Sequence, residues 1–335
     1  MTLILFMGAL MFVLGAVIGS FLNVCIVRMP HGKSIVTPRS HCVRCNRMIP
    51  WYDNIPLFSY LILRGRCRSC GERFSARYFF VELISGLSFL GLYLAYGLQP
   101  EIAAYAVMIS CFIVATFVDF EHRIIPDEIS VGGMVLGLLL SALLPGLHDL
   151  SPDNLAWGRL CMRIIVGACL LVHVLEYFFH RHDFDREDAV LFGIIAGMLA
   201  LEGVLGFVVK RTVLSGWIVH LWSLDAALIG ALLGGGVIYG MGLVGDVIFR
   251  KESMGGGDVK LMALVGAFLG WKLALVTFFV APFFGAVYGI AEKLRTKDSA
   301  IAYGPFLVLG ALISLFFGDV IIAWVVGQYG ISYNF

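Results

Sequence analysis

Long apolar runs recur along the chain and are separated by short polar stretches. About ten of these runs approach the roughly twenty residues that a helix needs to cross a bilayer, the eighth being the shortest. The predicted spans are 2–27, 79–98, 101–118, 128–145, 160–179, 189–209, 224–249, 259–270, 272–291 and 304–326. The pattern predicts an all-α polytopic membrane protein with about ten transmembrane helices.

One long polar segment, 28–78, interrupts this pattern and is the candidate soluble domain. The run before it has no basic flank and no small-residue cleavage pattern, so we interpret it as a retained span and not as a cleaved signal peptide. The predicted organisation is a first transmembrane helix (1–27), a small polar domain (28–78) and a large transmembrane domain (79–335).

Composition agrees with a membrane protein. The 335 residues are 60% hydrophobic and 14% charged, with a mean hydropathy of +0.91. Soluble domains carry roughly 25% charged residues. The net charge of +1 argues against nucleic acid or another polyanion as a partner, and the lipid bilayer is the expected surrounding.

The placement of basic residues predicts the orientation. If the N-terminus lies outside, 19 of the 24 Lys and Arg residues fall on the cytoplasmic side. This asymmetry follows the positive-inside rule. It puts the 28–78 domain, Asp119 and Asp258 at the cytoplasmic face.

The polar domain contains two CxxC pairs, Cys42/Cys45 and Cys67/Cys70, with 21 residues between them. Each pair can present two thiolates from one tight turn, and two pairs complete a tetrahedral zinc site. Two disulfides are the alternative, but a reducing cytoplasm favours zinc. Because four cysteines leave no open position on the metal, we predict a structural Zn²⁺.

Two carboxylates lie at predicted membrane edges. Asp119 ends the third span, and Asp258 follows a glycine run at the start of the eighth. A carboxylate at the rim of the hydrocarbon is costly and is by default functional. Two such groups brought together would share a proton, as general acid/base attack of water on a peptide carbonyl requires.

The glycine run Gly255, Gly256 and Gly257 is poorly helical in isolation. We expect irregular backbone there, with free N–H and C=O groups able to pair with an extended substrate strand. The alternative is an interfacial loop in which Asp258 resembles a helix N-cap.

Other acidic residues compete for a role and are expected to reach the interface or to face a packed interior. The segment HRHDFDRED at 180–188 has the composition of a metal site, although a hydrated hairpin is the commoner structure for such a run. The other acids in or near spans are Glu82, Glu176, Glu202, Asp225 and Asp246, and Glu121 and Asp127 flank Asp119.

Several stretches together resemble the type IV prepilin peptidases, bifunctional leader peptidase/N-methyltransferases among the GxGD-type intramembrane aspartic proteases. The glycine–aspartate motif alone also fits presenilin-like proteases, so the combination carries the resemblance. The matching stretches, in family order, are GSFLNVCIVRMP (19–30), both CxxC pairs, IPWYDNIPLFSYLILRGRCRSC (49–70), RYFFVEL (77–83), the Asp119 segment ending in IIPD, GGGDVKL (255–261) and YGPFLVLG (303–310).

The resemblance implies an aspartic endopeptidase with Asp119 and Asp258 as its catalytic pair. It implies cleavage of prepilins or type II secretion pseudopilins at the cytoplasmic side of the bacterial inner membrane. It also implies methylation of the new N-terminus with S-adenosylmethionine. The sequence contains no nucleotide-type glycine fingerprint that would locate the binding site of this cofactor. Compared with the family pattern, 145–223 resembles a two-span insertion.

Two other classes are kept open. A proton-coupled transporter also uses intramembrane carboxylates. Paired glycine-broken helices in corresponding halves of the chain would favour a transporter, but the sequence has only one such break. A zinc-stabilised scaffold without chemistry would tolerate Asp119→Asn or Asp258→Asn, and a peptidase would not.

Overall fold

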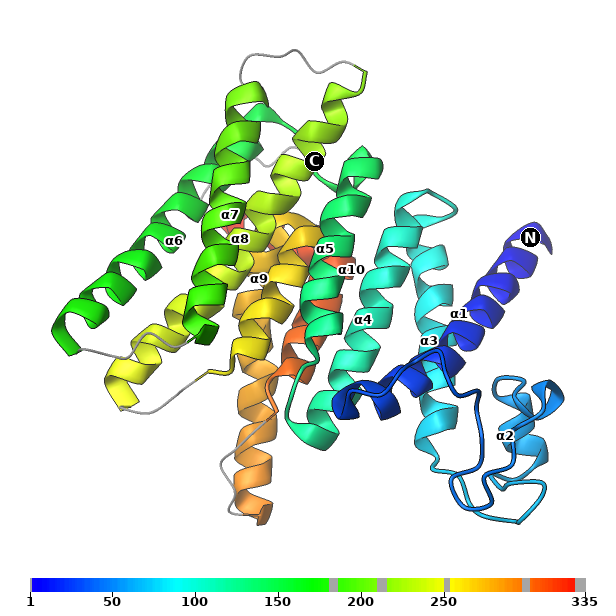
Figure 1. Ribbon diagram of the computed structural model, residues 1–335. Coiled ribbons are helices and arrows are strands. Elements are labelled where there is room, and N and C mark those ends of the chain that lie inside the picture. The colour runs from blue at the N-terminus through cyan, green and yellow to red at the C-terminus, as the bar shows by residue number, and fades with distance from the viewer. Residues whose placement is uncertain (1, 181–185, 210–215, 250–253, 297–301, 329–335) are drawn as a thin grey trace. The chain divides into compact units, whose positions relative to one another are not determined.

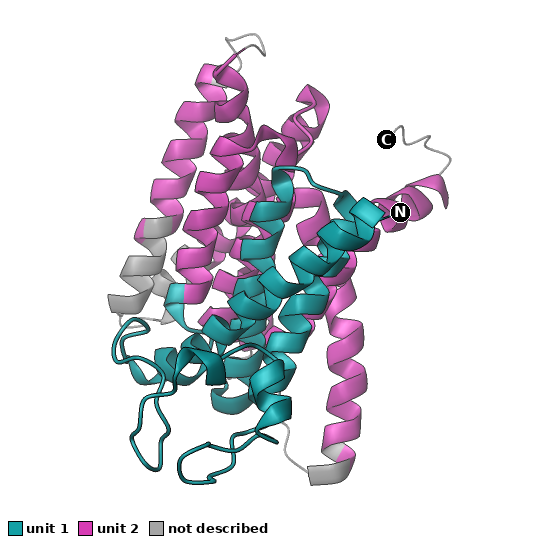
Figure 2. Cartoon of the chain, turned by 90° about the vertical axis from the view of Figure 1, so that its right-hand side faces the viewer, with its two compact units in different colours: residues 1–128 teal, residues 129–335 magenta. Residues whose placement is uncertain are grey.

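The computed structural model describes residues 2–180, 186–209, 216–249, 254–296 and 302–328. The chain forms two compact units, 1–128 and 129–335, coloured separately in Figure 2. Throughout these described stretches the regular structure is helical, with two isolated β-bridges and no strand. The predicted all-α class is confirmed.

Three long helices build the first unit: α1 (Thr2–Arg28), α3 (Arg77–Tyr96) and α4 (Glu101–His122). Helix α1 packs on both of the others. A Cβ at Gly15 would lie 2.5 Å from the carbonyl oxygen of Ser85, so this glycine lets α1 approach the α3 backbone closely. The polar segment between α1 and α3 holds the short helix α2 (Phe58–Ile62) and three-residue 3₁₀ turns at Met29–His31 and Trp51–Asp53.

The second unit is a helical bundle (Figure 1). Helix α8 packs against α6, α7 and α9, and α10 packs against α9. The helices are α5 (Asp127–Leu143), α6 (Pro152–His180), α7 (Arg186–Val209), α8 (Ile218–Phe249), α9 (Gly256–Thr296) and α10 (Gly304–Gln328), with a 3₁₀ turn at Pro145–Leu147.

Seven helices of the described residues are long and apolar enough to cross a membrane: α1, α3, α4, α6, α8, α9 and α10. Each of the ten predicted runs falls on a helix, but α5 has 17 residues and α7 is represented by a shorter apolar stretch, Ile195–Val208. The eighth and ninth runs are halves of α9, which is interrupted at Gly270 (φ 76°, ψ 175°). The centre of the HRHDFDRED hairpin, 181–185, lies outside the described residues.

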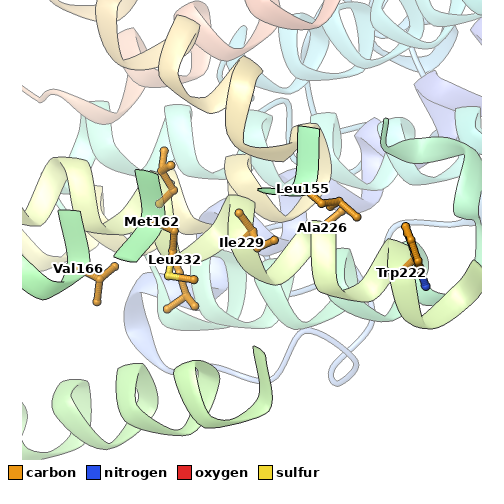
Figure 3. Packing of buried hydrophobic residues seen from close by; sticks show 8 residues of the cluster. Leu155, Met162, Val166, Trp222, Ala226, Ile229 and Leu232 are labelled. Carbon is orange, nitrogen blue, oxygen red and sulfur yellow. The ribbon is translucent and has the colours of Figure 1, made fainter. Parts of the chain in front are cut away.

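Apolar side chains of α6 and α8 interlock inside the second unit (Figure 3). Leu155, Met162 and Val166 of α6 meet residues of α8 that recur every three or four positions. Spacings of this kind place side chains on one helix face. The α8 residues are Trp222, Ala226, Ile229, Leu232 and Leu233.

Helices α8 and α9 touch backbone to backbone at one glycine pair. A Cβ at Gly230 would lie 2.1 Å from the carbonyl oxygen of Gly266, and a Cβ at Gly266 would lie 2.0 Å from that of Gly230. No side chain fits at either position. Close approach of small residues is how helices gain van der Waals contact where lipid is as apolar as protein.

His148 fills the space beside the interruption of α9. A Cβ at Gly270 would lie 3.2 Å from the His148 Nδ1, and the His148 Nε2 is enclosed without a hydrogen-bond partner among the described residues. Burial lowers the pKa of His148 to about 4 from its ordinary 6.5, although the ring also bonds the backbone at Ala267.

Acidification should therefore destabilise this region. The neutral imidazole contributes fully above pH 6.5, and its contribution is lost as the pH falls from 6.5 through about 4, because the unfolded chain takes up the proton first. We expect His148 to account for about 2 kcal/mol of the loss, after discounting for its partial exposure. Thermal unfolding in detergent between pH 7 and pH 4 measures it. A His148→Phe variant with the same pH slope as the wild type would contradict the prediction.

Candidate functional site

The four cysteines of the CxxC pairs converge on one point. One sulfur from each residue lies within 4.8 Å of all the others, and the Cys42 and Cys70 Sγ atoms are 3.7 Å apart. All four are free thiols, so the disulfide alternative is not what the structure shows. The cluster could hold a metal ion in a tetrahedral shell of thiolates.

The two CxxC turns have the same local structure. In each, the backbone N–H of the first cysteine bonds the carbonyl five residues ahead: Cys42 to Arg47 at 3.0 Å, and Cys67 to Glu72 at 2.8 Å. The residue after the second cysteine is left-handed in both, Asn46 with φ 56° and Gly71 with φ 73°. Asparagine and glycine are the residue types that accept this conformation most readily.

Backbone N–H groups favour the thiolate form of Cys42 in the first turn. Hydrogen bonds from the backbone at Cys45 and then Arg44 lower the pKa of the Cys42 thiol to about 7 from 9.0. Thiolate is the form that binds metal. An ion pair between Arg44 and Glu72 links the two turns beside the cluster.

Asp119 lies in the last turn of α4 and is 5% exposed. The helix ends just after it, because Arg123 is left-handed (φ 56°) and its N–H bonds the Asp119 carbonyl oxygen at 2.9 Å. The neighbouring Glu121 is ion-paired with Arg77 of α3. The Asp119 carboxylate is thus buried, whereas the Glu121 carboxylate, two residues away, is half-exposed and ion-paired.

Asp258 lies in the first turn of α9, where its N–H bonds the Gly255 carbonyl oxygen at 3.1 Å. The helix includes Gly256 and Gly257, so the irregular backbone expected for the whole glycine run is confined to Gly255. The first-turn N–H groups of a helix need no intrahelical partner, and packing against α8 overrides the low helix propensity of glycine. Gly255 and Gly256 are exposed, and nothing lies within 4 Å of a Cβ built on Gly256.

Tyr303 is a polar neighbour of Asp258 that the sequence reasoning missed. It precedes α10, and its ring lies 3.3 Å from the position of a Cβ on Gly285. Burial, and then the charge of Asp258, raise the pKa of the Tyr303 phenol to about 12, so it stays protonated at neutral pH. A tyrosine opening the apolar run YGPFLVLG was the available signal.

Asp119 belongs to the first unit and Asp258 to the second, and their pairing stays a prediction. Two of the competing acids have a structural role inside the second unit. Asp225 and Glu202 both contact Arg159, with 3.3 Å between the Arg159 Nε and the Glu202 Oε1. Buried charges are tolerated when paired in this way.

Comparison with known proteins covers both units. The profile of the Bacterial Peptidase A24 N-terminal domain matches residues 13–96, and that of the Type IV leader peptidase family matches 106–219 and 211–290. No solved structure matches the chain. These matches give the transporter alternative no support.

Curated relatives align over nearly their whole length. The chain is 32% identical to the prepilin leader peptidase/N-methyltransferase of Myxococcus xanthus over 92% of this chain and 89% of the relative. It is 29% identical to that of Aeromonas salmonicida (94% and 92%) and 27% identical to that of Bacillus subtilis (95% and 97%). The chain therefore belongs to the Type IV leader peptidase family.

Proposed function

We propose that this chain removes the leader peptide of type IV prepilins or type II secretion pseudopilins and methylates the new N-terminal amine. The observation that carries the proposal is the continuous match, through both units, to relatives named for these two activities. The seven apolar helices support a multi-pass protein of the bacterial inner membrane. Prepilin or pseudopilin precursors are the partners, and nucleic acid is not.

Asp119 and Asp258 are the proposed catalytic pair. A helix amino terminus stabilises negative charge and a helix carboxyl terminus does not. Asp258, at the start of α9, is therefore the better candidate for the ionised aspartate that activates water. Asp119, buried at the end of α4, is the better candidate for the protonated aspartate. Protonation of the leaving amine by the second carboxyl completes hydrolysis.

Gly255, Gly256 and Gly257 are the proposed approach for the substrate backbone. Two observations support this role: Gly255 and Gly256 are exposed, and the space beside Gly256 is open. Unpaired N–H groups of the first helical turn can donate to the carbonyls of an extended strand. Tyr303 supplies a further protonated donor near Asp258.

The cysteine cluster is proposed to hold a structural Zn²⁺, and methylation requires S-adenosylmethionine as methyl donor. Four thiols within bonding reach of one centre fit zinc and leave no open position. The distribution of Lys and Arg supports an outside N-terminus, with the zinc domain and both aspartates at the cytoplasmic side.

Mass spectrometry of a prepilin incubated with the full chain in liposomes tests the proposal. With S-adenosylmethionine present, we expect loss of the leader and one added methyl group. With an Asp258→Asn chain, the substrate should keep its leader. Cleavage without methylation would reduce the function to a peptidase, and an uncleaved substrate would contradict the proposal.

A further inference from the structure

The short helix α2 exposes apolar side chains on one of its faces. Phe58, Leu61 and Ile62 are 66%, 62% and 74% exposed. Residues three and four positions apart lie on the same side of a helix, so these three side chains form one surface. Another side of α2 is held in place, because Ser59 is buried and its hydroxyl donates to the Tyr52 carbonyl oxygen at 3.1 Å. The apolar face is therefore part of an ordered helix.

Two exposed aromatic residues lie in the 3₁₀ turn that contacts α2. Trp51 is 74% and Tyr52 is 52% exposed, and their ring centroids are 5.8 Å apart. Such rings are enriched where a membrane meets water, because one end of each is apolar and the other can form hydrogen bonds. Contiguous exposed apolar surface marks a place that a partner covers. We call Trp51, Tyr52, Phe58, Leu61 and Ile62 the α2 face.

Helix α2 is attached to α3 close to the point where α3 begins (Figure 1). The Leu57 N–H, just before α2, donates to the Glu82 Oε2 at 2.8 Å. The Tyr60 and Phe79 ring centroids are 5.6 Å apart. Glu82 lies five residues after the first residue of α3, about 8 Å along the helix axis. Helix α3 is long and apolar enough to span a membrane, and the headgroup layer on each side of a bilayer is about 5–8 Å thick. The α2 face therefore lies near the depth at which α3 passes from water into lipid.

The segment that carries α2 is strongly basic. Residues 28–78 include ten Lys and Arg and two acidic residues, a net charge of +8, whereas the rest of the chain has a net charge of −7. The charge of +1 for the whole chain conceals this contrast. Both acidic side chains of the segment are ion-paired, Asp53 with Arg68 and Glu72 with Arg44. The exposed basic residues are Lys33, Arg39, Arg44, Arg47, Arg64, Arg66, Arg68 and Arg73.

An exposed apolar surface beside clustered arginines fits an anionic bilayer. Helices that lie in the membrane interface combine Trp, Phe and Leu on one face with Lys and Arg on the other. The negative surface potential of anionic lipids attracts basic segments that lie close to the membrane. Arg64 and Arg66 are exposed and follow α2 within four residues, so both signals occur in one short stretch of the chain.

We propose that the α2 face docks on the bilayer around α3, with its apolar side chains between the lipid acyl chains and with Arg64 and Arg66 at the phosphates of anionic headgroups. Docking adds a third attachment to the bilayer, besides α1 and α3, for the segment that carries the cysteine cluster. It does not depend on the peptidase or methyltransferase activity proposed above. Burial of apolar area supplies adhesion, and the basic residues select anionic lipid.

The fluorescence of Trp51 reports docking directly. The full chain is placed in nanodiscs of phosphatidylglycerol whose acyl chains are brominated near the headgroup, because bromine quenches a tryptophan that it touches. The chain has six tryptophans, and subtraction of the Trp51→Phe spectrum isolates the emission of Trp51. We expect brominated lipid to remove about half of this emission or more. Trp51 should also emit at a shorter wavelength than a tryptophan in water.

The choice of lipid tests the arginines. In brominated phosphatidylcholine, which has no net charge, quenching of Trp51 should be weaker. An Arg64→Gln/Arg66→Gln chain should lower the ratio of docked to undocked Trp51 in phosphatidylglycerol by about fivefold per arginine, and leave it unchanged in phosphatidylcholine. Added salt should also weaken docking in phosphatidylglycerol, because it screens exposed charges. Equal quenching of the wild type in the two lipids, at low and at high salt, would overturn the assignment to anionic lipid.

A matched pair of charge substitutions tests the apolar face. Leu61→Asp puts a carboxylate into the face and should reduce the quenching of Trp51 severalfold, because a charge resists transfer into lipid. Val43→Asp puts the same charge on a valine that is 85% exposed in the first CxxC turn, and should leave the quenching unchanged. Circular dichroism of both chains checks that their helices are intact. A Leu61→Asp chain that is quenched like the wild type would overturn the role of α2.

Two other results would also overturn the proposal. If brominated lipid leaves Trp51 bright while iodide in the buffer quenches it, the α2 face lies in water. If neither quencher reaches Trp51, a protein surface covers the face in place of lipid.

Discussion

Replacing Asp258 or Asp119 by asparagine is expected to lower the kcat for leader cleavage about 10³-fold or more. Each change keeps the size of the side chain and removes the ability to exchange a proton, and general acid–base catalysis of this kind contributes about 10²–10⁴-fold per group. Rate losses from residues that act together in one catalytic step are not additive. The double variant should therefore cleave little more slowly than either single variant. Single-turnover cleavage of a detergent-solubilised prepilin measures these rates.

Glu121→Gln is the matched control, because Glu121 lies two residues from Asp119 and its carboxylate is ion-paired with Arg77. Its cleavage rate should remain within a few-fold of the wild type. Methylation of a peptide that already begins at the mature N-terminus should survive in both aspartate variants. Full cleavage by either Asp→Asn chain would rule out the aspartic mechanism.

Removing the metal is the second large effect that we expect. A strong chelator, or Cys42→Ser, should unfold the polar segment between α1 and α3, because structural zinc contributes about 10–16 kcal/mol of apparent binding free energy to small domains. Fast hydrogen exchange should appear within 40–74.

Exchange in α8 and α9 should stay slow, since their packing lies within the second unit. Cys161→Ser, a half-buried cysteine of α6 outside the cluster, serves as the control and should retain the metal. One equivalent of zinc per chain, measured by atomic absorption, is the expected content. Immediate loss of cleavage with unchanged hydrogen exchange would show that the metal is catalytic.

Local patterns were enough to predict the helices and the cluster of four cysteines. A run of twenty apolar residues has few alternatives to a spanning helix, and all ten predicted runs fall on helices or halves of one. A CxxC turn depends on only a few neighbouring residues, so Cys42, Cys45, Cys67 and Cys70 were found from spacing alone.

Features that depend on contacts distant in the chain were not predicted. Glu82 was expected to be one of several interface or interior acids, and it accepts a hydrogen bond from the Leu57 N–H, 25 residues away in the chain. Asn23 meets Tyr78 across 55 residues. The helical start at Gly256 was missed because propensity weighs less than packing. The proximity of Asp119 and Asp258 stays a prediction from the resemblance.

The contact between Gly230 and Gly266 has a consequence for the accuracy with which Asp258 is placed. Gly266 lies eight residues along α9 from Asp258, which corresponds to about 12 Å of helix. Each carbonyl of the pair lies where a Cβ on the other glycine would be, so a shift of α9 along α8 would bring a larger side chain into this contact. A slip of a single residue would rotate Asp258 by about 100° and shift it by about 1.5 Å. A displacement of about 1 Å from the reactive position can cost about 10²-fold in rate. Two glycines that take no part in the chemistry therefore help to fix the position of the Asp258 carboxylate.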